Sequence, residues 1–150
     1  MRIEIQVKKL EVSTNSEIPD IKPVRNIRID LNHSYQPPEL YSENSIRSRH
    51  KISIGYYEEE AGRRREIGAI DCSIVVLFSD ESVDKIQQIY DIWNNQGYNN
   101  LPLDVRVALE NNISLGVLPA ISVAAEKARL PPPIPPLALS PRPAPSGPLK

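Results

Sequence analysis

The chain has 150 residues, of which 40% are hydrophobic and 25% are charged, a balance that is ordinary for one soluble globular domain. Lys and Arg number 18 and Asp and Glu number 19, so the formal net charge of −1 argues against general electrostatic binding of nucleic acid. One cysteine cannot form an intrachain disulfide, and no secretory signal begins the sequence, so a cytoplasmic location is expected.

The first half of the sequence predicts β-strands. Apolar residues alternate from Ile3 to Val7 and again from Leu10 to Val12, one residue out of phase, which predicts a strand with a β-bulge at Lys8 and Lys9. The last strand, around residues 67–78, is the most apolar and is predicted to be central. No helical pattern separates the strands, so the sheet is expected to be antiparallel. The remaining strands are predicted around residues 27–31 and 52–56.

Two connections between these strands have an unusual composition. Residues 32–44 contain two adjacent prolines together with Tyr35, Leu40 and Tyr41, and they predict a long connection. Long loops in small domains are often functional, although tyrosines that pack the loop down would explain the pattern equally well. Residues 58–65 read Glu-Glu-Glu-Ala-Gly-Arg-Arg-Arg, which predicts a hairpin whose acidic and basic runs pair and stay solvated.

Helices are predicted after the strands. Ser79 and Asp80 are the expected cap of an amphipathic helix over 83–93, and Gly97 is suited to its C-terminal end. A second helix is expected to begin near Asp104 and to stop at the prolines that follow residue 130.

The second predicted helix is apolar on more than one side. It carries no charge from residue 111 to 125, a run too short to cross a bilayer, which needs roughly 20 residues. Pro119 predicts a kink or break within it. A helix that is apolar on two sides is buried on two sides, so we expect it to contact a second copy of the chain. The alternative is a single core helix with a disordered tail. The residues expected at the interface are Ile113, Val117, Ile121, Ala124, Ala125 and Ala128.

These patterns predict an α+β fold, with a four-stranded antiparallel sheet followed by helices packed on one face. The compact domain is expected to span residues 1–139, and the proline-rich residues 140–150 are expected to form a flexible tail.

Catalytic motifs are missing from the sequence. His33 and His50 are not at metal-ligand spacing from each other or from Cys or acidic residues, and the sequence has no glycine-rich phosphate loop or nucleophile elbow. Asp71 and Cys72 are neighbours in a strand and therefore point to opposite faces. We expect no enzymatic activity, no metal and no cofactor.

The order of elements resembles the SecB export-chaperone family from about Ile3 to Leu139. The sharpest parts of the resemblance are the strand through Lys8 to Val12 and the run from Val117-Leu118-Pro119 to Leu130-Pro131-Pro132-Pro133-Ile134. The resemblance implies an ATP-independent holdase that binds unfolded polypeptides and assembles as a homotetramer, a dimer of dimers. By position, it implies client contacts through Tyr35, Leu40, Tyr41, Ile134, Leu137 and Leu139.

The chain departs from the family on its first strand. Where the family commonly reads Lys-Asp and then Glu, this sequence has Lys8-Lys9 and then Ser13, so docking on the translocase motor is expected to be weak or absent. A divergent SecB-like chaperone, dedicated to a client such as an antitoxin, is the favoured interpretation. The alternative is a phage or mobile-element assembly protein that oligomerises through residues 103–129 and has no client groove.

Overall fold

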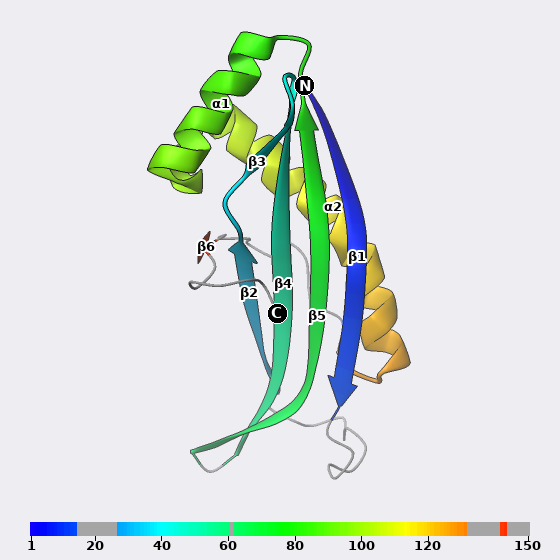
Figure 1. Ribbon diagram of the computed structural model, residues 1–150. Helices are drawn as coiled ribbons and strands as arrows, with labels where there is room; N and C mark the ends of the chain where they lie inside the picture. The colour runs from blue at the N-terminus through cyan, green and yellow to red at the C-terminus, as the bar shows by residue number, and fades with distance from the viewer. Residues whose placement is uncertain (15–26, 61, 132–141, 144–150) are drawn as a thin grey trace.

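The computed structural model describes residues 1–14, 27–60, 62–131 and 142–143, and these form an antiparallel sheet with helices on one face (Figure 1). The sheet order is β1-β5-β4-β2-β6, and β3 also pairs with β4. All pairings are antiparallel except that between β2 and β6. The predicted α+β fold is therefore confirmed. The elements are β1 (Arg2–Thr14), β2 (Ile27–Tyr35), β3 (Glu39–Ser42), β4 (Ser45–Glu60), β5 (Arg63–Ser79), α1 (Val83–Gln96), the short 3₁₀-helix η1 (Tyr98–Asn100), α2 (Leu103–Lys127) and β6 (Arg142–Pro143).

The predicted bulge in β1 is present, between Val7 and Lys9. Before the bulge Val7 lies opposite Ile74 of β5, and after it Leu10 lies opposite Cys72. Successive strand residues point to opposite faces, so one inserted residue restores the apolar side chains to the face that the helices cover.

The long connection predicted at 32–44 is wrong. β2 continues to Tyr35, and after a short gap β3 resumes pairing with the same strand, β4. Within the gap the backbone N–H of Gln36 still donates to the carbonyl of Arg49 at 3.0 Å. The two prolines interrupt the ladder only briefly, because they remove donors over two residues and leave the flanking residues free to pair.

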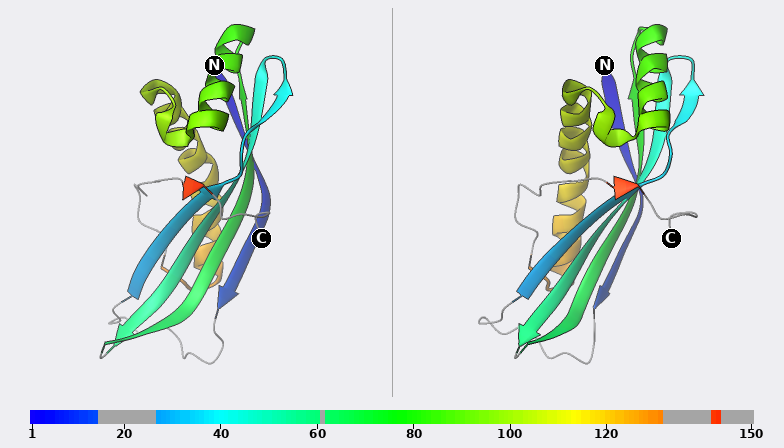
Figure 2. Two further views of the ribbon diagram at one scale, coloured as in Figure 1. Left: turned by 60° about the vertical axis from the view of Figure 1, so that its left-hand side comes forward. Right: turned by 90° about the vertical axis from the view of Figure 1, so that its left-hand side faces the viewer.

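Strand β5 is central, as predicted, with β1 on one side and β4 on the other. One of its faces is buried by the helices (Figure 2). Helix α2 runs behind β5 and β1, and it comes close enough that a Cβ at Gly116 would lie 3.1 Å from Ile5. Helix α1 lies at the end of the sheet that carries β3. The buried β5 side chains include Ile70, Cys72, Ile74, Val76 and Phe78.

The cap of α1 differs from the prediction. The N-cap is Ser82, whose hydroxyl accepts a hydrogen bond from the backbone N–H of Lys85 at 3.3 Å. Asp80 instead accepts from the backbone N–H of Ser82 at 3.0 Å. The helix starts at Val83, as predicted, but its cap is Ser82, because Ser82 lies nearer to the first turn than Ser79 or Asp80 and its side chain satisfies that turn. Gly97 ends the helix with φ of 96°, as predicted.

Helix α2 is one continuous helix that passes through Pro119, so the predicted break there is wrong. Its buried residues recur at intervals of four from Val105 to Ile121, continue at Ala124 and Ala125, and form one stripe against the sheet, which holds the helix together on both sides of the proline. By length and composition alone α2 could also cross a membrane, but a core helix of a soluble protein meets the same criteria. The buried stripe is Val105, Leu109, Ile113, Val117, Ile121, Ala124 and Ala125.

The side of α2 that the sheet leaves uncovered is apolar too. The exposed fractions are 66% for Leu103, 43% for Val107, 76% for Leu115 and 51% for Val123. Of the six residues predicted to contact a second copy, five are buried within this chain and Ala128 is partly buried. A second copy would therefore meet the exposed side of α2.

Two substitutions on α2 test which side forms the core. Ile121→Ala removes a fully buried side chain and should lower the free energy of unfolding by about 2–5 kcal/mol. Val123→Ala, two residues away on the exposed side, should lower it by less than about 1 kcal/mol. Urea unfolding followed by circular dichroism measures both, and equal losses would show that the stripe is wrongly assigned.

Candidate functional site

The residues predicted to bind clients do not form one surface. Tyr35 is buried, with 7% of its surface exposed, whereas Leu40 and Tyr41 are exposed on β3 at 42% and 61%. Leu40 lies opposite Ile46, whose side chain is in the core, so Leu40 is on the helix side of the sheet. Tyr41 lies on the other face, where Arg47 stacks on its ring at 5.1 Å. The other predicted residues, Ile134, Leu137 and Leu139, lie outside the described residues.

A groove of about 370 Å³ lies on the face of the sheet that the helices leave uncovered. Strands β1, β5, β4 and β3 all contribute to it, and we call it the β3 groove. Its walls carry charged side chains and Tyr41, and half-buried Val75 and Leu77 provide its apolar part. The lining residues are Glu4, Gln6, Lys8, Tyr41, Arg47, Arg49, Val75 and Leu77.

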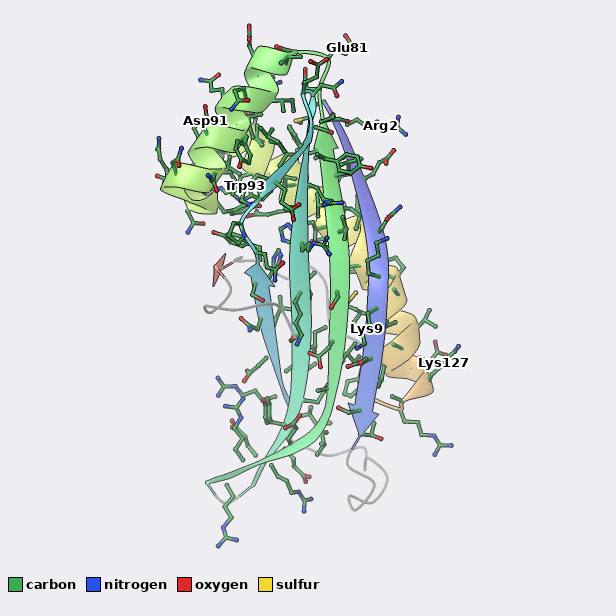
Figure 3. The ribbon with its side chains drawn as sticks, viewed as in Figure 1. Arg2, Lys9, Glu81, Asp91, Trp93 and Lys127 are labelled. Carbon is green, nitrogen blue, oxygen red and sulfur yellow. The ribbon has the colours of Figure 1, made fainter. Side chains whose placement is uncertain are left out.

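The bulge in β1 adds positive charge to this face. Lys8 lines the β3 groove, and Lys9 lies opposite Ser73, which points away from the core of the sheet (Figure 3). In a regular strand these two neighbours would point to opposite faces, but the bulge turns both toward solvent on the uncovered face. Lys9 pairs with Glu11 at 2.7 Å.

A second hollow, of about 420 Å³, lies between β1 and the C-terminal half of α2. We call it the edge cleft. Leu10 and Val12 of β1 and Val123 of α2 are its exposed apolar residues, at 37%, 39% and 51%. The edge cleft is open because β1 is the last strand on that side among the described residues. Its lining is Leu10, Val12, Thr14, Ala120, Val123, Ala124, Lys127 and Ala128.

A buried cluster of rings joins α1 to β2 and β4. The His33 Nε2 and His50 Nδ1 atoms are 2.8 Å apart, and His50 Nε2 is 2.6 Å from the Ser48 hydroxyl. Trp93 of α1 packs against His50 with ring centroids 6.4 Å apart (Figure 3). Tyr35 belongs to this cluster, and its hydroxyl accepts from the backbone N–H of Tyr98 at 3.4 Å.

The contact between the two histidines was missed because their separation in the sequence gives no ligand-like spacing. Both occupy inward positions of their strands, since His50 lies opposite Ile74 and His33 opposite Ile52. Extending the predicted alternation of the two strands to these positions would have placed both rings in the core.

Burial keeps both imidazoles neutral. It lowers the pKa of His33 to about 4, and burial together with His33 lowers the pKa of His50 well below its ordinary value. Burial also raises the pKa of the Cys72 thiol to about 11, which leaves it unreactive at neutral pH. Across the described part of the chain, no three His, Cys, Asp or Glu side chains are placed to hold a metal.

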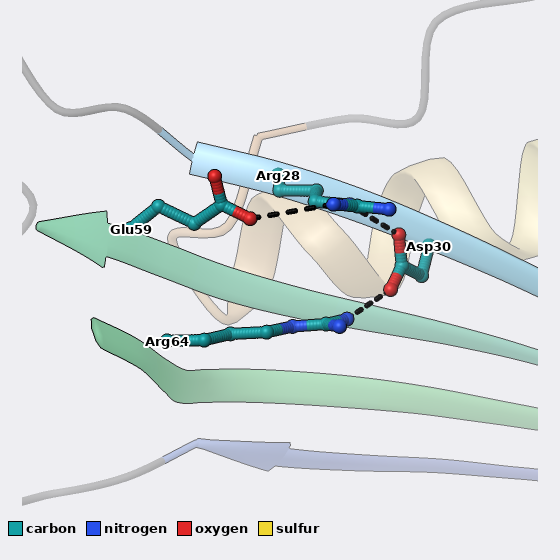
Figure 4. Close-up of polar contacts among 4 residues, drawn as sticks. All are labelled: Arg28, Asp30, Glu59 and Arg64. Atoms are coloured by element: carbon teal, nitrogen blue, oxygen red, sulfur yellow. Dashed lines mark hydrogen bonds and ion pairs between the residues drawn. The ribbon is translucent and has the colours of Figure 1, made fainter. Parts of the chain in front are cut away.

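The charged hairpin between β4 and β5 forms ion pairs, as predicted. Arg65 lies 3.2 Å from Glu58, and Arg28 of β2 bonds Asp30 at 3.0 Å and Glu59 at 3.4 Å (Figure 4). Arg64 also contacts Asp30. Arg64 and Arg65 of the basic run are therefore paired with carboxylates, which argues against a phosphate site there.

The layers, the strand order and the uncovered sheet face define a SecB-like fold. Among solved structures, the chain is similar to the SecB-like chaperone Rv1957 of Mycobacterium tuberculosis, which was determined in complex with a ChAD peptide from the HigA1 antitoxin Rv1956. The match has a TM-score of 0.56 and 13% sequence identity, and it covers 94% of this chain and 92% of that chain. No protein-family model and no curated protein matches the sequence. At this identity the likeness establishes the fold.

The buried histidine pair predicts that acid destabilises the protein. An unfolded histidine has a pKa near 6.5, so between pH 6.5 and about 4 the unfolded chain binds protons that folded His33 does not. Stability is therefore fully present above pH 6.5 and falls as the pH drops, by about 3 kcal/mol for His33 alone.

Urea unfolding between pH 7 and pH 5 measures about 2 kcal/mol of this loss. His33→Gln removes one of the two titrating groups, so this variant should lose less stability over the same pH interval, whatever its stability at pH 7. A wild-type chain whose unfolding free energy is constant over the interval would contradict the prediction.

Proposed function

We propose that the protein is an ATP-independent holdase that binds unfolded polypeptides. The observation that supports this most strongly is the SecB-like fold over almost the whole chain, shared with a chaperone that was determined with a bound peptide. We expect no enzymatic activity and no cofactor, and a cytoplasmic location. We further propose a dedicated client such as an antitoxin, because the bound peptide of the similar chaperone comes from an antitoxin.

The surfaces proposed for client contact follow from the exposure of apolar side chains. Leu40 and Tyr41 present apolar area on both faces of β3, and Ile134, Leu137 and Leu139 are proposed to add contacts. Burying about 100–150 Å² on one aromatic anchor contributes about 2.5–4 kcal/mol before the ordering cost, so several anchors are needed for useful affinity. Tyr35 would contribute by supporting the cluster beneath, because its own ring is buried.

We propose that docking on the general translocase motor is weak or absent. Strand β1 carries Lys9 and Ser13 at the positions where related chaperones that use this motor are expected to carry acidic residues. Like charges across an interface disfavour association.

Self-association is proposed through the exposed side of α2. Leu103, Val107, Leu115 and Val123 form an apolar surface that the chain itself does not cover. Exposed apolar surfaces of this kind mark interfaces, and we propose a homotetramer built as a dimer of dimers. The same surface would serve an assembly protein, so client binding decides between the two functions.

The holdase function is tested by suppression of aggregation. At stoichiometric ratio and without ATP, the protein should keep a chemically denatured test protein from scattering light on dilution. Leu40→Ser combined with Tyr41→Ser should weaken client affinity by about tenfold or more, because two apolar contacts are lost. Val83→Ser on α1, at 43% exposure, is the control and should leave suppression intact.

The single variants Leu40→Ser and Tyr41→Ser show which face of β3 contacts the client, because Leu40 and Tyr41 lie on opposite faces of this strand. A wild-type protein that fails to suppress aggregation would favour the assembly function. A double variant with full activity would exclude β3 from the client surface.

The oligomer is tested by a charge on the outer side of α2. Leu115→Glu should shift the assembly to a smaller species at micromolar concentration, because an unpaired buried charge costs several kcal/mol. Val83→Glu places the same charge on an exposed apolar position of α1 and should leave the mass unchanged. Light scattering coupled to gel filtration measures both, and a monomeric wild-type chain would refute self-association.

A further inference from the structure

The β3 groove combines positive charge with an apolar floor, and we propose that it binds an acidic, extended polypeptide segment. This occupant would place carboxylates against the basic walls and an aliphatic or aromatic side chain between them. The inference rests on the proposed function in one respect, namely that the occupant is a polypeptide.

The charges that line the groove favour an anionic occupant. Among the described residues, three cations, Lys8, Arg47 and Arg49, line the groove, and Glu4 is the one acidic lining residue. Lys8 has no carboxylate partner within the described part of the chain. The whole chain carries a net charge of −1, so this excess of positive charge is local to the groove.

The two arginines are already held in position by a single carboxylate. Glu39 lies 2.9 Å from the Arg47 Nη2 atom and 3.8 Å from the Arg49 Nε atom. Arg47 is further fixed by its stacking on Tyr41, and its buried Nε has no hydrogen-bond partner among the described residues. One carboxylate shared by two guanidinium groups leaves donors free for a second, incoming carboxylate.

The apolar part of the groove favours a peptide over a purely anionic ligand. Val75 and Leu77 of β5 are half-buried in the groove, and Tyr41 is 61% exposed at its wall. The lining residues of each strand alternate in sequence, as in Glu4, Gln6 and Lys8. The side chains of an extended peptide alternate in the same way, so charged and apolar residues of the occupant meet matching positions.

A nucleic acid fits this surface less well. Its backbone presents regularly spaced phosphates, which require an uninterrupted row of cations. Here Glu4 and Glu39 interrupt the cations, and both would face phosphates. A peptide with alternating acidic and apolar residues avoids this repulsion, because its charges are spaced.

Binding of synthetic peptides tests the proposal. The probe is a labelled peptide Glu-Leu-Glu-Tyr-Glu-Leu-Glu, with Lys in place of every Glu in the comparison peptide, and fluorescence anisotropy gives both affinities. The acidic peptide should bind at least about tenfold more tightly than the basic one in about 50 mM salt, and the difference should shrink in about 300 mM salt. Equal affinities for the two peptides would overturn the proposal.

Two charge reversals locate the site. Arg49 and Lys85 are both exposed cations with one carboxylate partner, at 3.8 Å and 3.4 Å, but only Arg49 lines the groove. Arg49→Glu should weaken binding of the acidic peptide by at least about tenfold, whereas Lys85→Glu should change it by less than about twofold. Lys8→Gln, which breaks no ion pair, should weaken it by about threefold and reduce its salt dependence. Retained affinity in both groove variants would refute the site.

Two parallel measurements keep this inference separate from the proposed function. If aggregation suppression fails while the acidic peptide still binds the groove, the holdase proposal falls and the site stands. If suppression succeeds without a preference for the acidic peptide, the groove proposal alone falls. A single-stranded oligonucleotide that binds as tightly as the peptide, and loses affinity with Arg49→Glu, would also overturn it in favour of nucleic acid.

Discussion

The apolar layer between the sheet and α2 is the interaction on which the rest of the structure depends. Ile113, Val117 and Ile121 of α2 are almost fully buried, and they face the central strand β5 and its neighbour β1. Burying such a side chain contributes about 1.5–3 kcal/mol, so this stripe is a main source of the stability of the two-layer arrangement. Gly116 allows the close approach, because a larger residue would press on Ile5. The helix also shields one face of the sheet and leaves the other uncovered.

The bulge in β1 connects this packing to the character of the free face. Without the extra residue, Leu10 and Val12 would turn away from α2, and the strand would lose its apolar contacts. With it, Leu10 and Val12 stay on the helix side of the sheet, where they line the edge cleft, and Lys8 and Lys9 both reach the uncovered face. One local irregularity therefore serves the core and makes the outer surface basic.

The far end of the sheet is held differently, by the rings between α1 and strands β2 and β4. A chain of contacts runs from Ser48 through His50 to His33, and Trp93 covers it. A neutral imidazole carries one N–H, so in each of these contacts one atom can donate and the other can accept. If both rings were protonated, two N–H groups would face each other across the contact between His33 and His50. Because Trp93 of α1 packs against His50, the position of α1 close to β3 depends on the two histidines being neutral.

Local pattern determined the strands, the bulge, the charged hairpin and the apolar character of α2 on two sides. These features depend on alternation and spacing within a few residues, which the sequence displays directly. The continuity of α2 through Pro119 could not be read in this way, because packing on a distant sheet holds the helix on both sides of the lost hydrogen bond. Strand β3 could not be read from local pattern either, because its pairing with β4 outweighs the effect of the two prolines that precede it.

The candidate site was only partly visible in the sequence. The exposure of Tyr41 and of the adjacent Lys8 and Lys9 of β1 follows from local pattern. Arg47 and Arg49 become part of the β3 groove only because β4 pairs with β5, which in turn pairs with β1. Tyr35 looked like a surface aromatic, yet the tertiary structure buries it beside Tyr98, which is 63 residues away. Sequence determined which residues are apolar, charged or aromatic, and at what local spacing. Tertiary structure decided which of them face solvent together, because strand register and helix packing join residues that are far apart in the chain.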